Sequence, residues 1–269
     1  MDFAFDERTE ELRAELLAFM DSHVYPAESE FERTDPEAPF SWERPKVMAE
    51  LQAEARRRGL WNLFLPHSER GAGLSNVQYA PLAEITGRSP QIAPEALNCA
   101  APDTGNMELL HMFGTPEQQE RWLKPLLEAS IRSAFCMTEP DVASSDASNI
   151  SLTMAPTDGG GFVLNGRKWW STGAMSGDCA VLLVMGVSEP DAPRHQRHTI
   201  LLVPRDTPGV EVRRACRRSG SGTRPTAGTP RWCSTTSTWG PRRCWGSAAG
   251  GSRWPRRGWG RAGSTTACG

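Results

Sequence analysis

The chain has 269 residues, of which 38% are hydrophobic, enough to build the core of one large domain or of two smaller ones. Its formal net charge of −2 combines two unlike segments. Residues 1–212 hold 18 of the 30 basic residues and all 32 acidic ones, a net charge of −14, whereas residues 213–269 hold twelve arginines and no other charged residue. The acidic segment lacks the basic footprint with which proteins bind nucleic acid, so we expect no nucleic-acid partner.

The composition also argues against membrane spans, disulfide frameworks and metal sites. No apolar run approaches the roughly 18 residues of a membrane span, and the first residues are acidic where a secretory signal is basic and then apolar. Seven cysteines without pairwise or zinc-like spacing predict neither disulfides nor a metal centre. We expect a cytoplasmic protein with buried thiols at Cys99, Cys136 and Cys179.

Helical patterns run through residues 1–130 and predict an N-terminal all-helical domain. Apolar positions recur at helical spacing, Gly59 and Pro26 mark predicted helix ends, and Ser75 and Thr115 are predicted N-caps. The predicted helices cover residues 6–24, 45–58, a stretch after Ser75, 91–99, 104–112 and a stretch after Thr115.

Strand patterns follow and predict a small antiparallel β-barrel or sandwich over residues 131–213. The chain would therefore be an α+β multidomain protein. Asn165-Gly166 is the strongest hairpin signal, because both residues tolerate positive φ. The predicted strands cover residues 133–137, 150–154, 162–164, 168–171, 180–187, 198–203 and 210–213.

The remaining segment, residues 214–269, has a different composition. It contains no Val, Ile, Leu, Met or Phe, but five tryptophans and four cysteines among many Gly, Ser, Thr, Pro and Arg residues. No periodic apolar face can form, so we predict a disordered tail without a packed domain. The alternative is an arginine-rich arm that binds nucleic acid or an acidic partner.

Two clusters combine groups that suit a flavin. Residues 135–146 (Phe-Cys-Met-Thr-Glu-Pro-Asp-Val-Ala-Ser-Ser-Asp) end a strand with a hydroxyl at Thr138 and anion donors at Ser144 and Ser145. Residues 168–173 (Lys-Trp-Trp-Ser-Thr-Gly) place two aromatic faces beside two hydroxyls. An isoalloxazine ring needs an aromatic or apolar wall and hydrogen-bond donors. The alternative is an ordinary strand and turn, with a tryptophan pair that fills the core.

The clusters resemble signatures of the acyl-CoA dehydrogenase family. Met-Thr-Glu-Pro with the following small-residue turn, residues 137–146, is similar to the first signature, and Trp-Ser-Thr at 170–172 matches the second. Residues 101–108 and 165–171 look like the branch known as family members 10 and 11, and the turn at 141–146 is one residue longer than the commonest form. The resemblance runs from about residue 3 to residue 214.

The resemblance implies FAD as cofactor and assigns site residues. Phe135, Cys136, Met137 and Thr138 would lie along the flavin, with Thr138 on its pyrimidine edge. Ser145 would sit where flavin and acyl-CoA meet. The remaining assignments place Trp170 on the ring and Thr172 on the N5 side, with Trp169 and Ser171 in support, and bring the segment 98–106 toward the acyl pocket. Glu139 would be structural.

The resemblance also implies a reaction and partners. The family's fatty acid β-oxidation chemistry removes a proton from Cα of an acyl-CoA while hydride leaves Cβ for flavin N5, giving a trans-2-enoyl-CoA. Electron-transfer flavoprotein is the expected acceptor, and the family forms homo-oligomers. Its base lies in a C-terminal four-helix domain that we expect to be absent, so we expect no catalytic residue and a truncated, inactive fragment. The alternatives are a non-catalytic acyl-CoA or partner-binding remnant and a flavin oxidase or monooxygenase.

The tail suggests how the resemblance ends. Residues 259–269 can be encoded by a GC-rich sequence that, shifted by one base, reads Leu-Gly-Pro-Gly-Arg-Ile-His-His-Cys-Met-Arg. That peptide resembles the family's first C-terminal helix. We hypothesise a frameshift near residue 214, after which the chain is an out-of-frame translation.

Overall fold

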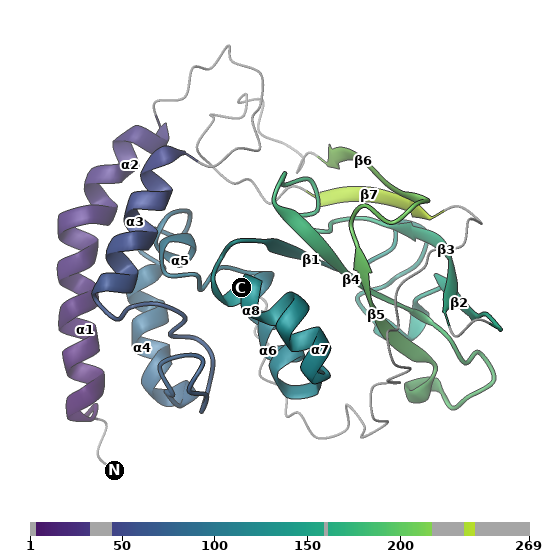
Figure 1. Cartoon of the computed structure of the whole chain (residues 1–269), viewed down its shortest axis with the longest axis horizontal. Helices are drawn as coiled ribbons and strands as arrows, with labels where there is room; N and C mark the ends of the chain where they lie inside the picture. Colours follow the sequence, from purple (N-terminus) through teal and green to yellow (C-terminus); the bar gives the residue numbers. More distant parts are fainter. Residues whose placement is uncertain (1–3, 33–44, 159–160, 217–233, 240–269) are drawn as a thin grey trace. The chain divides into compact units, whose positions relative to one another are not determined.

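A computed structural model of the chain describes residues 4–32, 45–158, 161–216 and 234–239 (Figure 1). They form two compact units. The helical unit takes the described residues within Met1–Leu109 and Leu123–Ser130, and the β unit takes those within Leu110–Trp122, Ile131–Arg218 and Trp232–Gly269. The described segments therefore confirm an α+β chain, with helices first and strands after.

Several helix ends lie where local signals predict them. Asp6 caps the first helix by accepting from the Thr9 amide at 3.0 Å, and Ser75 and Thr115 each form a capping box. Gly59 takes φ 71° after the third helix, as a C-terminal glycine does. The helical segments are α1 (Glu7–Phe19), a π-helical turn (Met20–Val24), α2 (Tyr25–Glu32), α3 (Lys46–Arg57), α4 (Asn76–Thr86), α5 (Ala93–Ala96), α6 (Asp103–Phe113), α7 (Pro116–Gln118), a second π-helical turn (Gln119–Leu123) and α8 (Lys124–Leu127).

The prediction that Pro26 ends the first helix is wrong. The π-helical turn closes with a bond from the Tyr25 amide to the Met20 carbonyl, and α2 continues to Glu32. Pro26 therefore lies inside a continuous helical run, directly after the π-helical turn, and both features interrupt the regular i→i−4 hydrogen-bond ladder without ending the helix.

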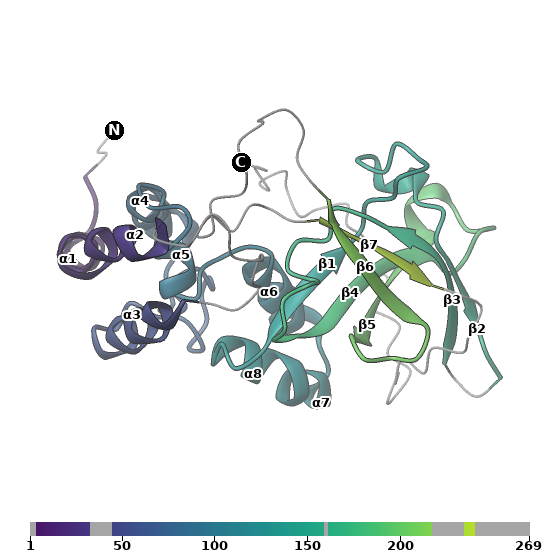
Figure 2. The same ribbon diagram turned by 90° about the horizontal axis from the view of Figure 1, so that it is seen from above.

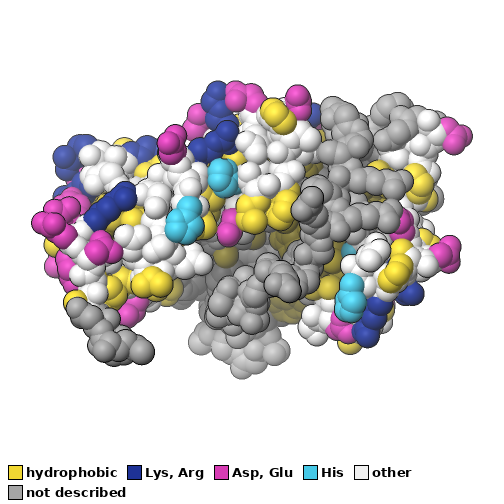
Figure 3. Space-filling view, turned by 90° about the horizontal axis from the view of Figure 1, so that it is seen from below, with side chains coloured by type: hydrophobic (Ala, Val, Ile, Leu, Met, Phe, Trp, Pro, Cys, Tyr) yellow, Lys and Arg dark blue, Asp and Glu magenta, His cyan; other side chains and the backbone are white. Residues whose placement is uncertain are grey.

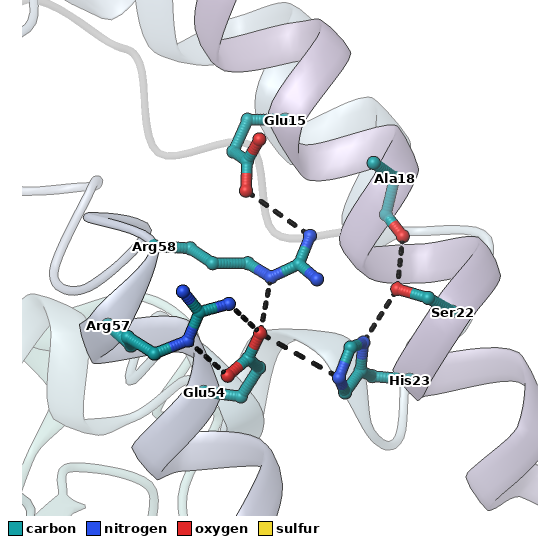
Figure 4. A network of polar contacts seen from close by, with 7 residues as sticks. All are labelled: Glu15, Ala18, Ser22, His23, Glu54, Arg57 and Arg58. Atoms are coloured by element: carbon teal, nitrogen blue, oxygen red, sulfur yellow. Dashed lines mark hydrogen bonds and ion pairs between the residues drawn. The ribbon is translucent and has the colours of Figure 1, made fainter.

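The helical core lies between the long helices, with α1 beside α4 (Figure 2). Its fully buried members come from α1, the first π-helical turn, α3, α4 and α5 and include Leu16, Phe19, Met20, Leu51, Ala55, Leu82, Ile85 and Ala96. At its edge, Glu54 on α3 accepts from Arg57 and Arg58, and Arg58 reaches Glu15 on α1 at 3.2 Å (Figure 4). An ion-pair network thus joins α3 to α1.

The β unit holds a mixed, unclosed sheet. Its strands are β1 (Arg132–Cys136), β2 (Thr153–Pro156), β3 (Phe162–Lys168), β4 (Cys179–Val187), β5 (His198–Pro204), β6 (Val210–Cys216) and β7 (Ser234–Trp239), in the order β1-β4-β2-β3-β7-β6, with β5 also paired to β4. The expected all-antiparallel sheet is corrected, because β1 and β2 pair with β4 in parallel. Some forty residues of chain separate β1 from β4, enough for a crossover between parallel strands.

The predicted Asn165-Gly166 hairpin is also wrong. Both residues lie inside β3, where Asn165 pairs with Thr153 of β2. The turn lies earlier and is closed by the Thr157 amide, which donates to the Gly161 carbonyl at 2.9 Å. Gly166 serves packing instead: a Cβ there would lie 2.8 Å from Cβ and Cγ of Leu152. The glycine lets β3 pass close under that leucine.

Two described parts of the predicted disordered tail are strand: residues 214–216, at the end of β6, and all of β7. β7 pairs antiparallel with β3 and with β6. Its run of Ser and Thr residues needs no apolar face for this, because β-branched threonines favour extended backbone and two open strand edges supply the hydrogen bonds. The rest of residues 217–269 lies outside the described residues. The frameshift hypothesis concerns that part of the chain and stays a hypothesis.

On the face shown in Figure 3, acidic and basic side chains are interspersed. Among the described residues, no helix has the length and hydropathy needed to cross a membrane, and no group of three or more His, Cys, Asp or Glu side chains could hold a metal ion. Cys136 and Cys179 are buried, as predicted, while Cys99 is half-buried.

Candidate functional site

The two predicted clusters adjoin in the β unit. Thr138 follows β1 and Trp169 follows β3, and the two residues form a reciprocal pair. The Trp169 amide donates to the Thr138 carbonyl at 3.0 Å, and Thr138 Oγ1 donates to the Trp169 carbonyl at 2.6 Å. Segments 31 residues apart thus meet where two strands end.

Trp170, next to this junction, is in an unusual state. Its φ is 54°, and its side chain is 40% exposed, although it is one of the largest apolar side chains. Left-handed backbone is a genuine outlier for a bulky residue, and such outliers gather at ligand sites. The Trp169 and Trp170 rings pack edge to face with their centroids 5.8 Å apart, so the partly exposed Trp170 ring is not stacked on its neighbour.

The strand β1 directs its side chains to two faces. Ala134 and Cys136 are fully buried in the sheet core, and burial raises the pKa of the Cys136 thiol to about 11. Phe135 and Met137 alternate with them, are half-buried and face the other way. Cys136 can therefore offer a ligand only its backbone, and its position along the flavin stays a prediction.

In the loop after β1, the adjacent residues Ser144 and Ser145 were both predicted to bind the cofactor, but their environments differ. The Ser144 hydroxyl accepts from the Glu139 amide at 2.7 Å and is 3.3 Å from the Glu139 carbonyl, and the Ser144 amide donates to Val142. Both donors of Ser144 are thus used within the loop, so the structure does not support its prediction as an anion donor. Ser145 is exposed.

The loop is held at both ends by exposed ion pairs. Arg167 Nη2 is 2.7 Å from Asp141, and Arg194 Nη2 is 2.6 Å from Asp146. Ion pairs as exposed as these stabilise a loop only weakly. Of the other predicted residues, Ser171 is buried and Thr172 half-buried, in the turn that follows Trp170.

Asn98, expected near an acyl pocket, is engaged inside the helical unit. Its fully buried Nδ2 donates to Asn62 Oδ1 at 2.7 Å and to the Leu126 carbonyl at 3.0 Å. Asn62 and Asn98 both have left-handed φ, near 55°, which asparagine tolerates best among non-glycine residues. Asn98 thus caps α8 in the structure. A depression of about 410 Å³ in the same unit is lined by His67–Glu69 and Gly71–Gly73 and by none of the predicted site residues.

A buried ion pair lies beside the Thr138 junction, and sequence reasoning missed half of it. Lys168 Nζ is 2.8 Å from Glu139 Oε1, and the two side chains are 0% and 3% exposed. Burial raises the pKa of Glu139, but the hydrogen bonds from Lys168 and Ser151 outweigh it and hold that pKa below its ordinary value. Strand alternation could have found Lys168, because it shares the inward side of β3 with Leu164.

The comparisons with known proteins agree with this arrangement. Family models match residues 6–130 as the acyl-CoA dehydrogenase N-terminal domain and residues 134–229 as the acyl-CoA dehydrogenase middle domain. This chain belongs to the acyl-CoA dehydrogenase family.

Relatives extend well beyond the matched region. The chain is 53% identical over 216 residues to a probable acyl-CoA dehydrogenase, FadE2 of Mycobacterium tuberculosis, covering 80% of this chain and 52% of that protein. It is 48% identical to acyl-CoA dehydrogenase family member 11 of Mus musculus, covering 78% of this chain and 27% of the relative. This acyl-CoA dehydrogenase chain therefore spans about half the length of the first relative and about a quarter of the second.

Solved structures share the fold. A putative acyl-CoA dehydrogenase from Mycobacterium abscessus superposes with a TM-score of 0.81 at 47% identity, covering 89% of this chain and 59% of that one. A glutaryl-CoA dehydrogenase from Mycobacterium smegmatis in complex with FADH2 shares the fold at 20% identity, with a TM-score of 0.64, over 89% of this chain and 54% of that one.

Proposed function

We propose that the β unit binds the isoalloxazine ring of FAD at the Thr138–Trp169 junction and is part of an FAD-dependent acyl-CoA dehydrogenase. The observation that carries this is the left-handed, 40% exposed Trp170 beside Thr138. Family membership supports FAD, acyl-CoA as substrate and electron-transfer flavoprotein as acceptor. We extend the proposal to a homo-oligomer that acts in fatty acid β-oxidation in the cytoplasm, with residues 1–130 and 131–213 as its two domains and 214–269 as its tail.

The residues present fit the ring. Trp170 offers an aromatic face, and Phe135 and Met137 offer half-buried apolar surface on the side of β1 away from the core. Thr138 has committed its single hydroxyl proton to the Trp169 carbonyl, so its oxygen can only accept from a ligand N–H. We assign half-buried Thr172 to the N5 side, Trp169 and Ser171 to support of the turn, and exposed Ser145 to contact with the acyl-CoA.

When bound, FAD supplies the hydride acceptor, and the protein must orient an acyl thioester and remove its Cα proton. Glu139, the carboxylate next to Thr138 in the chain, is a poor base because it is buried, paired with Lys168 and depressed in pKa. We therefore propose that this chain holds the cofactor but does not turn over acyl-CoA by itself.

Reconstitution with FAD tests the proposal. The chain should retain flavin absorbance after gel filtration, and Trp170→Ala should lose it with little change in far-UV circular dichroism. Added acyl-CoA should not bleach the flavin. If the wild-type chain binds no FAD, or if Trp170→Ala binds as well as wild type, the proposal fails.

The same sample separates the other functions. A non-catalytic acyl-CoA or partner-binding remnant would bind acyl-CoA in calorimetry without FAD. A flavin oxidase or monooxygenase would consume oxygen when its flavin is reduced.

A further inference from the structure

The buried Glu139–Lys168 pair connects the Thr138–Trp169 junction to the segment before β2. Lys168 Nζ donates to Glu139 Oε1 and to the Met137 carbonyl, both at 2.8 Å. Glu139 also accepts from the Leu152 amide at 2.9 Å and the Ser151 amide at 2.8 Å. A buried charge is retained only when it is paired and bonded in this way.

The pair brackets the proposed ligand residues in the sequence. Met137 and Glu139 flank Thr138, and Lys168 precedes Trp169. Lys168, at the end of β3, thus hydrogen-bonds the carbonyl of Met137, the residue before Thr138. Glu139, the residue after Thr138, is hydrogen-bonded to Ser151 and Leu152, just before β2. A shift of the Glu139 backbone would move Thr138, and a shift of the Lys168 backbone would move Trp169, because the two residues of each pair are joined by a peptide bond.

We propose that Glu139 and Lys168 are positioning residues that hold Thr138 and Trp169 in register and so shape the flavin site without touching the ring. This rests on the proposed function for its consequence in cofactor binding, but the register itself is a property of the chain alone. A buried pair that merely stabilised the sheet would be replaceable by neutral residues without local effect.

The double variant Lys168→Met/Glu139→Gln tests this. Lys168→Met alone leaves a buried carboxylate without its amine and can prevent folding, whereas the double variant removes both charges and keeps similar volumes. The matched control is Arg167→Met/Asp141→Asn, which removes the neighbouring ion pair, whose side chains are 44% and 71% exposed.

Two measurements follow on the full chain. Amide hydrogen exchange without FAD should speed up in peptides covering residues 135–139 and 168–172 of the double variant, and not in the β4–β5 ladder at residues 181–185. In the FAD titration, the double variant should bind about tenfold more weakly, as expected for one mispositioned hydrogen bond, with altered visible circular dichroism of the flavin. The control should match wild type in both.

The outcomes are distinct. Unchanged exchange at the junction, or exchange that rises equally throughout the sheet, would overturn the positioning role. A local change in exchange with FAD binding equal to wild type would overturn its link to the flavin. If wild type binds no FAD, the proposed function fails, and the exchange result still decides whether the pair sets the register.

Discussion

Gly166→Ala should destabilise the β unit because β3 passes directly under Leu152. The new methyl carbon would lie 2.8 Å from Cβ and Cγ of Leu152 and 2.9 Å from its Cα. Optimal carbon contacts are about 3.5–4.0 Å, so the two strands would have to separate by several tenths of an ångström.

The buried surroundings leave little room for that movement. Leu152 is 1% exposed, and Gly186 of β4 approaches it from another strand, where an added Cβ would lie 2.6 Å from Leu152 Cδ2. Overpacking of this kind costs about 1–3 kcal/mol. A loss of about 2 kcal/mol would lower Tm by roughly 4–8 °C in a chain of this size.

Thermal unfolding followed by circular dichroism measures the effect, and Gly105→Ala is the matched control. Gly105 lies in α6, and a Cβ there meets nothing within 4 Å. Alanine should therefore stabilise that helix by about 1 kcal/mol, the difference in helix propensity. A Gly166→Ala protein with unchanged or raised Tm would refute the close-packing argument.

Three further predictions concern the Glu54 ion-pair network, the Asn98 cap and the buried Cys136 thiol. The hydrogen bond from Arg57 is the main cause that lowers the pKa of Glu54 to about 2, so its contribution to stability is complete above the ordinary pKa near 4.5 and is lost as pH falls toward about 2. Glu54→Gln should flatten the curve of Tm against pH in that window, and an unchanged curve would contradict the network. Asn98→Ala should cost about 2–4 kcal/mol in urea unfolding, since it removes the buried hydrogen bonds that Asn98 Nδ2 donates to Asn62 Oδ1 and to the Leu126 carbonyl and leaves alanine at φ 54°; a cost under about 0.5 kcal/mol would show that the cap is dispensable. Cys136, whose pKa burial raises to about 11, should resist iodoacetamide at pH 8 in the native protein and react after denaturation, as read by peptide mass spectrometry; native labelling would contradict its burial.

Local signals predicted most of the fold correctly. Caps at Ser75 and Thr115 depend on side chains three residues away, and the helical and strand periods depend on neighbours within one or two turns. The errors arose where distant chain changed a local preference. Asn165-Gly166 has hairpin propensity, yet its pairing with β2 and the closeness of Leu152 favour a continuous strand.

The candidate site divides in the same way. The motif Met-Thr-Glu-Pro and the pair Trp169 and Trp170 can be read directly from the sequence. They predicted a flavin site and a resemblance to the family. The sequence does not predict which hydroxyls are available to a ligand. Ser144 and Ser145 are adjacent residues of the same type, yet Ser144 is hydrogen-bonded within the loop and Ser145 is exposed.

By itself, the sequence determined the element types, the change from helix to strand near residue 131 and the family, because these rest on composition, short-range periodicity and motifs. Only the tertiary structure decided that Thr138 pairs with Trp169, that Trp170 takes a left-handed backbone, and that Lys168 reaches Glu139. The physical reason is distance along the chain: contacts between residues about 30 positions apart depend on which strands meet and in which direction, and no local propensity contains that information.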